Sequence, residues 1–329
     1  MYAKAISGLA LAIAIALPAA AAELRFSSFE PPVAFLTGEV FPAWASRVEE
    51  ATGGEVTVKM FPGGTLGRSP AQQLKLVEDG VADVAFVVPG YTPGVFPGLS
   101  VAELPYTVTS SADGSVALWE MLDSGLLAGD FDRYKIIGLF VTSPQNIASK
   151  EPIALPEDMK GRNFRAASPA LLSAIEQMGA VAVGGITGPT IAESISRGVI
   201  EGSFNEWNAL KTFRVMDTVD HVLEVPMGTT PLMIVMNKQK YESLSDEARA
   251  GLDQVSGAPF AAILGAVFHD NNEAARAAAV EEGRIKITEP DQATMDAWRE
   301  ATKPAIDTWL AEDPGNAALL EAFRAAMNN

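Results

Sequence analysis

Short apolar runs of strand length alternate with longer segments of helical periodicity along most of the chain. Strands are expected where side chains alternate or form compact apolar runs, and helices where apolar residues recur every three to four positions. Ser-Pro pairs mark helix starts and glycines mark helix ends. This alternation predicts an α/β fold. The predicted strands are 24–28, 55–61, 81–88, 134–141, 163–166, 180–183, 199–205, 222–225, 232–236 and 284–288, and the main predicted helices are 36–51, 70–79, 169–178, 189–197, 238–252, 259–282 and 291–311.

The stretch 160–211 carries the clearest β-α-β-α-β pattern. Ser168-Pro169 supplies an N-cap followed by a proline at the first helical position, and Gly179 follows the apolar helix face. In open α/β layers, side chains just past the carboxyl ends of adjacent strands meet at a crevice where ligands bind. The residues that this pattern delivers to the crevice are Arg165, Asn205 and Trp207.

At these residues the sequence resembles the secreted solute receptors of tripartite ATP-independent periplasmic (TRAP) transporters, and the resemblance covers nearly the whole mature chain. The segment 157–165 is similar to one that ends, in that family, in an arginine that pairs with the ligand carboxylate. The run 198–202 (GVIEG) resembles the family's Gly-x-Val-Asp-Gly signature, and Asn205 lies where a ligand-contacting asparagine often lies. Where many members have a glutamate and a tyrosine in the preceding helix, this chain has Thr190 and Ala192.

The resemblance implies a two-lobed periplasmic binding protein fold, with a mixed sheet flanked by helices in each lobe, a long helix bracing both lobes, and a ligand cleft between them. It also implies a small carboxylate as ligand and a partner built of a small and a large integral membrane subunit, driven by an ion gradient. We expect a monomer. Two alternatives stay open: a receptor for an ABC importer, and a periplasmic enzyme acting on organic acids.

Further candidate ligand contacts come from loops and strand ends. Phe29 lies in the loop after the first strand, and Tyr91 lies in a proline-rich loop that resembles a cleft loop of the TRAP receptors. Gln145 follows a strand at an expected crossing between lobes, where it either donates to a bound oxygen or faces water. Phe204, together with Trp207, either walls the pocket or belongs to the core. Tyr91 has the alternative of a surface tyrosine packed on proline.

More than 300 mature residues exceed what one core usually serves, so two lobes are expected. We assign 23–145 plus about 231–258 to lobe I, 146–230 plus about 276–329 to lobe II, and about 259–275 to the bridging helix. A short echo between 80–86 and 198–204 suggests two similar β-α-β halves.

Residues 1–22 read as a cleaved secretory signal peptide, with Lys4, an apolar run too short to span a bilayer, and a small-residue end that predicts Glu23 as the mature N-terminus. An uncleaved anchor is the alternative.

Without cysteine there is no lipid-attachment site, disulfide or thiolate metal site, so we expect a periplasmic protein. The net charge of −17, or −18 once Lys4 is removed, argues against nucleic acid as a partner.

Signs of catalysis are scarce. His221 and His269 have no metal-ligand spacing, no G-x-S-x-G motif is present, and the glycines near residue 63 lack the lysine of a nucleotide-binding loop. The sequence thus predicts neither a metal, nor a cofactor, nor an enzyme.

Overall fold

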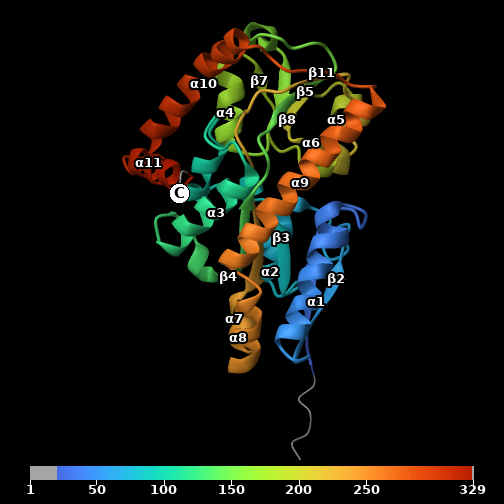
Figure 1. The fold of residues 1–329 in the computed structure, drawn as a ribbon, viewed down its shortest axis with the longest axis vertical. Coiled ribbons are helices and arrows are strands. Elements are labelled where there is room, and N and C mark those ends of the chain that lie inside the picture. The colour runs from blue at the N-terminus through green and yellow to red at the C-terminus, as the bar shows by residue number, and fades with distance from the viewer. Residues whose placement is uncertain (1–20, 328–329) are drawn as a thin grey trace, which may run out of the picture.

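The computed structural model describes residues 21–327, so the predicted signal peptide lies almost entirely outside the described residues. The chain folds into two lobes, each built on one sheet, with helices on the faces of both sheets (Figure 1). The predicted two-lobed α/β fold is therefore confirmed. In lobe I the sheet order is β2-β1-β3-β10-β4, and in lobe II it is β11-β9-β5-β8-β6-β7. The strands are β1 (Ala22–Ser27), β2 (Val56–Phe61), β3 (Val84–Val87), β4 (Tyr134–Val141), β5 (Asn146–Ser149), β6 (Asn163–Arg165), β7 (Val181–Ala182), β8 (Gly202–Asn205), β9 (His221–Leu223), β10 (Pro231–Asn237) and β11 (Lys286–Thr288).

The two lobes share one strand topology. In lobe I, β1 pairs in parallel with β2 and β3, and in lobe II, β6 pairs in parallel with β7 and β8. An antiparallel strand then follows in each sheet, β10 beside β3 and β5 beside β8. The echoing segments 80–86 and 198–204 lead into β3 and β8, which occupy equivalent places in the two sheets. Each lobe thus brings the carboxyl ends of three parallel strands to one edge.

Lobe I is organised by an apolar helix face packed on its sheet. In α1 the buried Phe41, Trp44 and Val48 recur every three to four positions, and Phe41 and Trp44 pack against Phe26 of β1. A π-helical turn, Leu36–Val40, leads into this helix. The helices of lobe I are α1 (Phe41–Ala51), α2 (Gln73–Glu78), α3 (Ser111–Asp123), α7 (Lys238–Glu242) and α8 (Asp246–Gln254), with the 3-10 turns η3 (Pro89–Tyr91) and η4 (Pro97–Glu103).

Lobe II follows the predicted β-α-β-α-β pattern closely. Ser168 caps α4 by accepting a hydrogen bond from the Leu171 backbone N–H, and Pro169 is the first helical residue. Gly179, which follows the end of this helix, has φ of 78°, a conformation that favours glycine. The helices of this lobe are α4 (Pro169–Gln177), α5 (Ile191–Ser196) and α6 (Trp207–Thr212).

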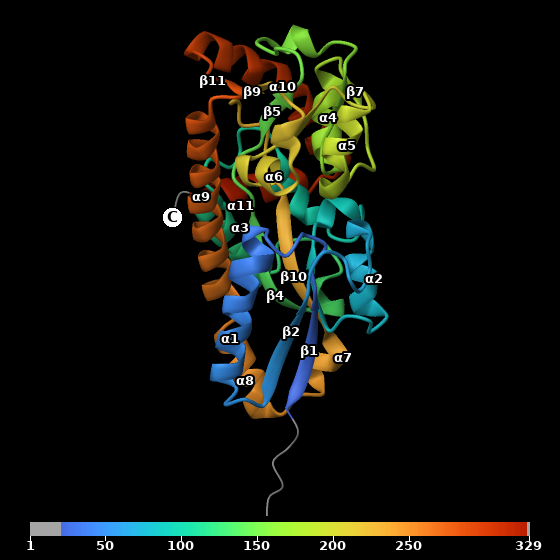
Figure 2. The ribbon, with the colours of Figure 1, turned by 90° about the vertical axis from the view of Figure 1, so that its right-hand side faces the viewer.

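The long helix α9 (Ala258–Glu282) runs along both lobes, as the two views show (Figures 1 and 2). Its first half buries Phe260, Leu264 and Phe268 in the core of lobe I, and its second half buries Ala275 and Ala279 in lobe II. By length and composition the segment Asp246–Glu282, which ends with this helix, could cross a membrane, but α9 packs on both lobes as core helices of folded domains do. The helix therefore braces the two lobes.

The last two helices pack on other parts of the molecule than the predicted lobe boundaries imply. Helix α10 (Gln292–Glu312) begins on lobe II, where Trp298 is buried, but Trp309 near its end belongs to the core of lobe I. Helix α11 (Asn316–Ala326) packs on α3 and buries Leu320 and Phe323 in that same core. The assignment of 276–329 to lobe II is thus wrong for the end of that range, because its apolar face continues across the lobe boundary.

Candidate functional site

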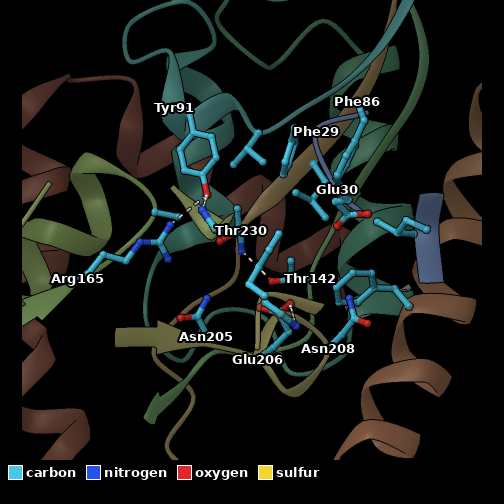
Figure 3. Close-up of a pocket in the computed structure, with 18 residues that line it drawn as sticks. Phe29, Glu30, Phe86, Tyr91, Thr142, Arg165, Asn205, Glu206, Asn208 and Thr230 are labelled. Atoms are coloured by element: carbon cyan, nitrogen blue, oxygen red, sulfur yellow. Dashed lines mark hydrogen bonds between the residues drawn. The ribbon is translucent and has the colours of Figure 1, made fainter. Parts of the chain in front are cut away.

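A pocket lies between the lobes, at the edge where the strand ends of both sheets meet (Figure 3). It encloses about 50 Å³. A cavity that binds benzene measures about 150 Å³, so a ring-sized ligand would enter this smaller pocket as the lobes or the lining side chains move apart. The lining residues are Phe29, Glu30, Leu36, Phe86, Val88, Tyr91, Thr142, Arg165, Ala167, Gly188, Asn205, Glu206, Asn208, Ala209, Phe213, Thr230, Leu232 and Phe268.

Arg165 is the only arginine or lysine among these lining residues. It ends β6, and its side chain is 1% exposed. Its Nε donates to the Ile186 carbonyl at 2.8 Å and its Nη2 to the Tyr91 hydroxyl at 3.1 Å. Neither hydrogen-bond partner is a carboxylate, and the Glu206 carboxyl interacts with the guanidinium by charge without forming an ion pair within the described residues. A buried cation in this condition can pair with an anion that enters the pocket.

Tyr91 and Asn205 flank the guanidinium. Tyr91 comes from lobe I, and its hydroxyl also accepts a hydrogen bond of 2.9 Å from the backbone N–H of Gly188 in lobe II. Gly188 is confined to glycine by packing, because a Cβ there would lie 2.5 Å from the Phe213 ring. The Oδ1 of Asn205 accepts from Ser203 at 2.7 Å. This bond fixes the amide so that its N–H₂ is the group left for a ligand.

Aromatic side chains from both lobes form the apolar wall. The Phe29 and Phe86 rings are stacked with centroids 5.1 Å apart, and the Phe29 and Phe213 rings are nearly parallel at 6.5 Å. Phe29 and Phe86 belong to lobe I and Phe213 follows α6 of lobe II, so this stack spans the cleft. Of these residues only Phe29 was expected at the site.

Two buried glutamates also line the pocket, and sequence reasoning missed both. Burial raises the pKa of Glu30 to about 7, with a hydrogen bond from Thr37 opposing the rise and the Glu206 charge adding to it. Burial also raises the pKa of Glu206 to about 7, opposed by backbone N–H groups and by Arg165. Near neutral pH each carboxyl therefore exists in both protonation states. Glu30 follows Phe29 in the loop after the first strand, but an isolated glutamate in an acidic chain carries no signal of its own.

The expected contacts Phe204 and Trp207 lie elsewhere. Phe204 is fully buried in lobe II and packs with Phe164, because successive side chains of β8 alternate between its faces and Asn205 takes the cleft side. Trp207 is the first residue of α6 and points into the core of lobe II, where its indole N–H donates to Glu224 at 2.9 Å. Neither side chain lines the pocket, so the core alternative describes both.

A second hollow at the lobe boundary lacks a cationic anchor. It has about 250 Å³, lies between 89–103, the start of α4 and α10, and its lining includes Glu103 and Glu312 but no arginine or lysine. Across residues 21–327, no group of three or more histidine, aspartate or glutamate side chains is placed to hold a metal ion. The interlobe pocket with Arg165 is therefore the candidate site for an anion.

Residues 26–313 match the family of bacterial extracellular solute-binding proteins, family 7. The match spans most of the chain. The chain belongs to this family. It is a periplasmic solute receptor of the TRAP type that binds a small organic acid, and delivery of that acid to the membrane subunits of the transporter is inferred from the family. These predictions are confirmed, and the ABC-importer alternative is set aside.

Solved structures and curated relatives agree with this assignment. A TRAP solute-binding protein from an unidentified marine microbe, specific for aromatic acids and bound to 3-hydroxybenzoate, is 29% identical, with a TM-score of 0.88 over 94% of this chain and 98% of its own. A TRAP solute-binding protein from Rhodoferax ferrireducens, bound to benzoate, is 26% identical, with a TM-score of 0.87 over 93% and 97%. The C4-dicarboxylate-binding periplasmic protein DctP of Rhodobacter capsulatus is 23% identical over 96% of this chain and 95% of its own.

In the receptor, Gln145 belongs to the crossings between the lobes. The segment after β4 is hydrogen-bonded to the segment before β10, with the Gln145 N–H donating to the Gly228 carbonyl at 2.8 Å. The Gln145 side-chain N–H₂ donates to the hydroxyl of Thr230, a lining residue, and its Oε1 is buried without a partner in the described chain. Gln145 is thus neither a solvated hinge residue nor a lining residue, and it orients one that lines the pocket.

Proposed function

We propose that the ligand of this receptor is an aromatic monocarboxylate. Its carboxylate binds Arg165, with Asn205 and Tyr91 beside it, and its ring lies against Phe29. The observation that carries the proposal is a buried guanidinium without a carboxylate partner, facing a pocket walled by phenylalanines from both lobes.

Charge pairing accounts for the anchor. A planar guanidinium meets both oxygens of a carboxylate at once, and in a water-poor cleft such a charge-assisted pair is strong and oriented. The Oδ1 of Asn205 is hydrogen-bonded to Ser203, so its amide N–H₂ supplies a further donor to the ligand carboxylate beside Arg165. A single anchor of this kind suits one carboxylate per ligand.

Ring stacking accounts for the aromatic part. The Phe29 and Phe213 rings are nearly parallel, with their centroids 6.5 Å apart. A flat ring placed between two others needs about 7–8 Å between their planes at ordinary carbon contact distances. An opening of the cleft that separates these two rings would therefore admit a ligand ring, which agrees with the pocket of about 50 Å³ being smaller than a cavity of about 150 Å³ that holds benzene. The aromatic acids bound by the two solved relatives support the same ligand class.

Capture, in this proposal, consists of closing the lobes on the ligand. Contacts from both lobes to one molecule stabilise the closed state over the open state, and the membrane partner distinguishes the two. We further propose that the receptor releases its ligand chemically unchanged. Members of the family are binding receptors, which supports this statement.

A thermal-shift screen tests the ligand class, with benzoate and hydroxybenzoates, C4-dicarboxylates, uronates and short keto-acids as the four sets. A ligand at 100 times its Kd adds about 2.7 kcal/mol to the free energy of unfolding, which raises the Tm of a chain of this size by a few degrees. We expect the aromatic acids to give the largest shifts. A larger shift with another set would overturn the aromatic assignment, and recovery of altered ligand would overturn the binding-only role.

A further inference from the structure

Two carboxyl groups enter the pocket from opposite lobes. Glu30 lies in the loop after β1, and Glu206 is the N-cap residue of α6; each is 4% exposed. Figure 3 shows Glu30 on the side of the pocket opposite Arg165, with Glu206 on the floor between them. A ligand anchored on Arg165 therefore extends its far end toward these two carboxyls.

Both carboxyls accept hydrogen bonds from the protein. Glu30 Oε2 accepts from the Thr37 hydroxyl at 3.0 Å, and that hydroxyl is 2.6 Å from the Ser28 hydroxyl. Glu206 Oε1 accepts from the Ala209 N–H at 3.0 Å. Neither carboxyl forms an ion pair within the described chain. An ionised carboxylate has about four lone-pair sites, so each group can accept a further hydrogen bond from a molecule in the pocket.

A structural role alone does not account for these residues. Ser, Thr, Asp and Asn are the favoured N-caps, and they satisfy the backbone with a shorter side chain than Glu206. Glu30 follows the apolar Phe29 in sequence and shares the pocket wall with Leu36 and Phe86. Burying a carboxyl group beside apolar side chains costs free energy unless other interactions compensate for it.

We propose that Glu30 and Glu206 determine ligand specificity: they accept a hydrogen bond from a hydroxyl at the far end of the aromatic monocarboxylate and reject a ligand with a second carboxylate there. This inference rests on the proposed function and names the substituent that the same site selects. A hydroxyl donates to a carboxylate oxygen at little desolvation cost, whereas a second carboxylate cannot donate and meets like charge in a cleft of low dielectric constant. The ionisable side chains that line the pocket are these two, Arg165 and Tyr91.

Titration calorimetry at pH 8, where both carboxyls are mainly ionised, separates the two parts of the inference. The probes are benzoate, 3- and 4-hydroxybenzoate, and the corresponding benzenedicarboxylates. The variants are Glu30→Gln and Glu206→Gln, which remove charge but keep an acceptor, and Glu30→Leu, which removes both. The matched control is Glu103→Gln, since Glu103 is equally buried at the lobe boundary but lines a different hollow.

We expect the wild type to bind one hydroxybenzoate at least about 10-fold more tightly than benzoate, and each dicarboxylate at least about 10-fold more weakly, each factor being about 1.4 kcal/mol. Glu30→Leu should abolish the preference for the hydroxyl, so that this variant binds the hydroxybenzoate and benzoate with affinities within about threefold of each other. The two Gln variants should each relax the rejection of dicarboxylates, and Glu103→Gln should leave the ranking unchanged.

Two failures are distinguishable. If the wild type binds benzoate but the Glu30 and Glu206 variants keep the wild-type ranking, the specificity role is wrong and the proposed function stands. If the wild type binds none of these acids, the proposed function fails and this inference fails with it.

Discussion

The hydroxyl of Tyr91, in lobe I, accepts a hydrogen bond of 3.1 Å from Nη2 of Arg165, in lobe II. Through the second bond from Gly188, this one phenol oxygen is held by two groups of the opposite lobe. The proposed anchor of the ligand is thereby also a contact between the lobes. Opening the cleft must break these bonds, and closing it must reform them beside the ligand carboxylate.

Tyr91→Phe removes the hydrogen bonds from Arg165 and Gly188 but keeps the aromatic ring at this position. Hydrogen bonds to charged groups are worth about 1.5–3 kcal/mol, so we expect ligand affinity to fall by about 10-fold or more while the folded state persists. Titration calorimetry with the ligand from the screen measures this. Tyr241→Phe is the control, because that hydroxyl donates to Asp253 in an exposed part of lobe I and should leave affinity unchanged.

Arg165→Ala and Arg165→Lys test the anchor itself. Losing one partner of a desolvated charge pair costs about 2–5 kcal/mol, which is roughly 30-fold to several-thousand-fold in affinity. Lysine should restore little of it, since a point charge does not reproduce the planar fork that binds two carboxylate oxygens. Calorimetry on both variants decides the matter, and an affinity within about threefold of the wild type for Arg165→Ala would place the carboxylate elsewhere.

Trp207→Ala should destabilise the fold and leave the ligand ranking alone, the reverse of what its position beside Asn205 suggests. The indole is buried in lobe II, and its N–H donates to a carboxylate that also pairs with Arg276 of α9. Deleting a core tryptophan costs about 3–5 kcal/mol, seen as a lower urea midpoint. Trp207→Phe, which keeps most of the packing, should lose only about 1–2 kcal/mol. An altered ligand ranking with unchanged stability would contradict this assignment.

Stability should fall as the pH rises from about 4.5 to about 7. Burial raises the pKa values of Glu30, Glu206 and Glu103 from 4.5 to about 7, so in that window the native state binds more protons than the unfolded state. Below the pKa of the unfolded state, these three carboxyls make their full contribution to the free energy of unfolding. The contribution is lost as the pH rises through the pKa of the folded state, about 7. Asp158 and Asp291, whose pKa values are lowered by backbone hydrogen bonds, act in the opposite sense at lower pH.

Urea midpoints at pH 5 and pH 8 measure this dependence. Each of Glu30→Gln, Glu206→Gln and Glu103→Gln should reduce the difference between the two midpoints, because each removes one group that titrates in the window. An unchanged difference in all three variants would show that these carboxyls do not take up protons on folding.

Export should leave a chain that begins at Glu23, since Ala20 and Ala22 present the small side chains that signal peptidase requires. In the structure β1 begins one residue earlier, with the Ala22 N–H donating to the Glu55 carbonyl at 2.7 Å. Cleavage after Ala22 therefore removes only the first bond of the strand. Mass spectrometry of the periplasmic protein checks the terminus, and a mature pool that retains Met1 would contradict export by this signal.

The sequence pointed to Arg165, Asn205, Tyr91 and Phe29, which line the pocket, but not to several other lining residues. Arg165 and Asn205 could be found because each ends a strand at the edge where parallel strands converge, a rule that local patterns reveal. Glu206, Phe213 and Phe268 reach the same pocket from a cap, a loop and the long helix. Their meeting depends on how the lobes and α9 pack, and no spacing along the chain encodes that.

The side of an element to which a residue belongs was also hard to predict. Trp207 follows Asn205 by two positions, which in a continued strand would place both on one side. The strand ends at Asn205 and a helix begins at Trp207, so the indole turns into the core instead. In the same way, the helical pattern of 291–311 gave the helix correctly but did not reveal that its two tryptophans pack into different lobes.

Those two tryptophans fix α10 at both ends. The Trp298 indole N–H donates to the Ala154 carbonyl in lobe II, and the Trp309 indole N–H donates to the Ser100 hydroxyl in lobe I. Between them lies Pro304, whose missing N–H leaves a helix one bond weaker at that turn. The helix α10 is thus attached to both lobes, which are expected to move relative to each other when the cleft opens. We expect the opening of the cleft to be limited by how far α10 can bend at Pro304 while both indoles stay buried.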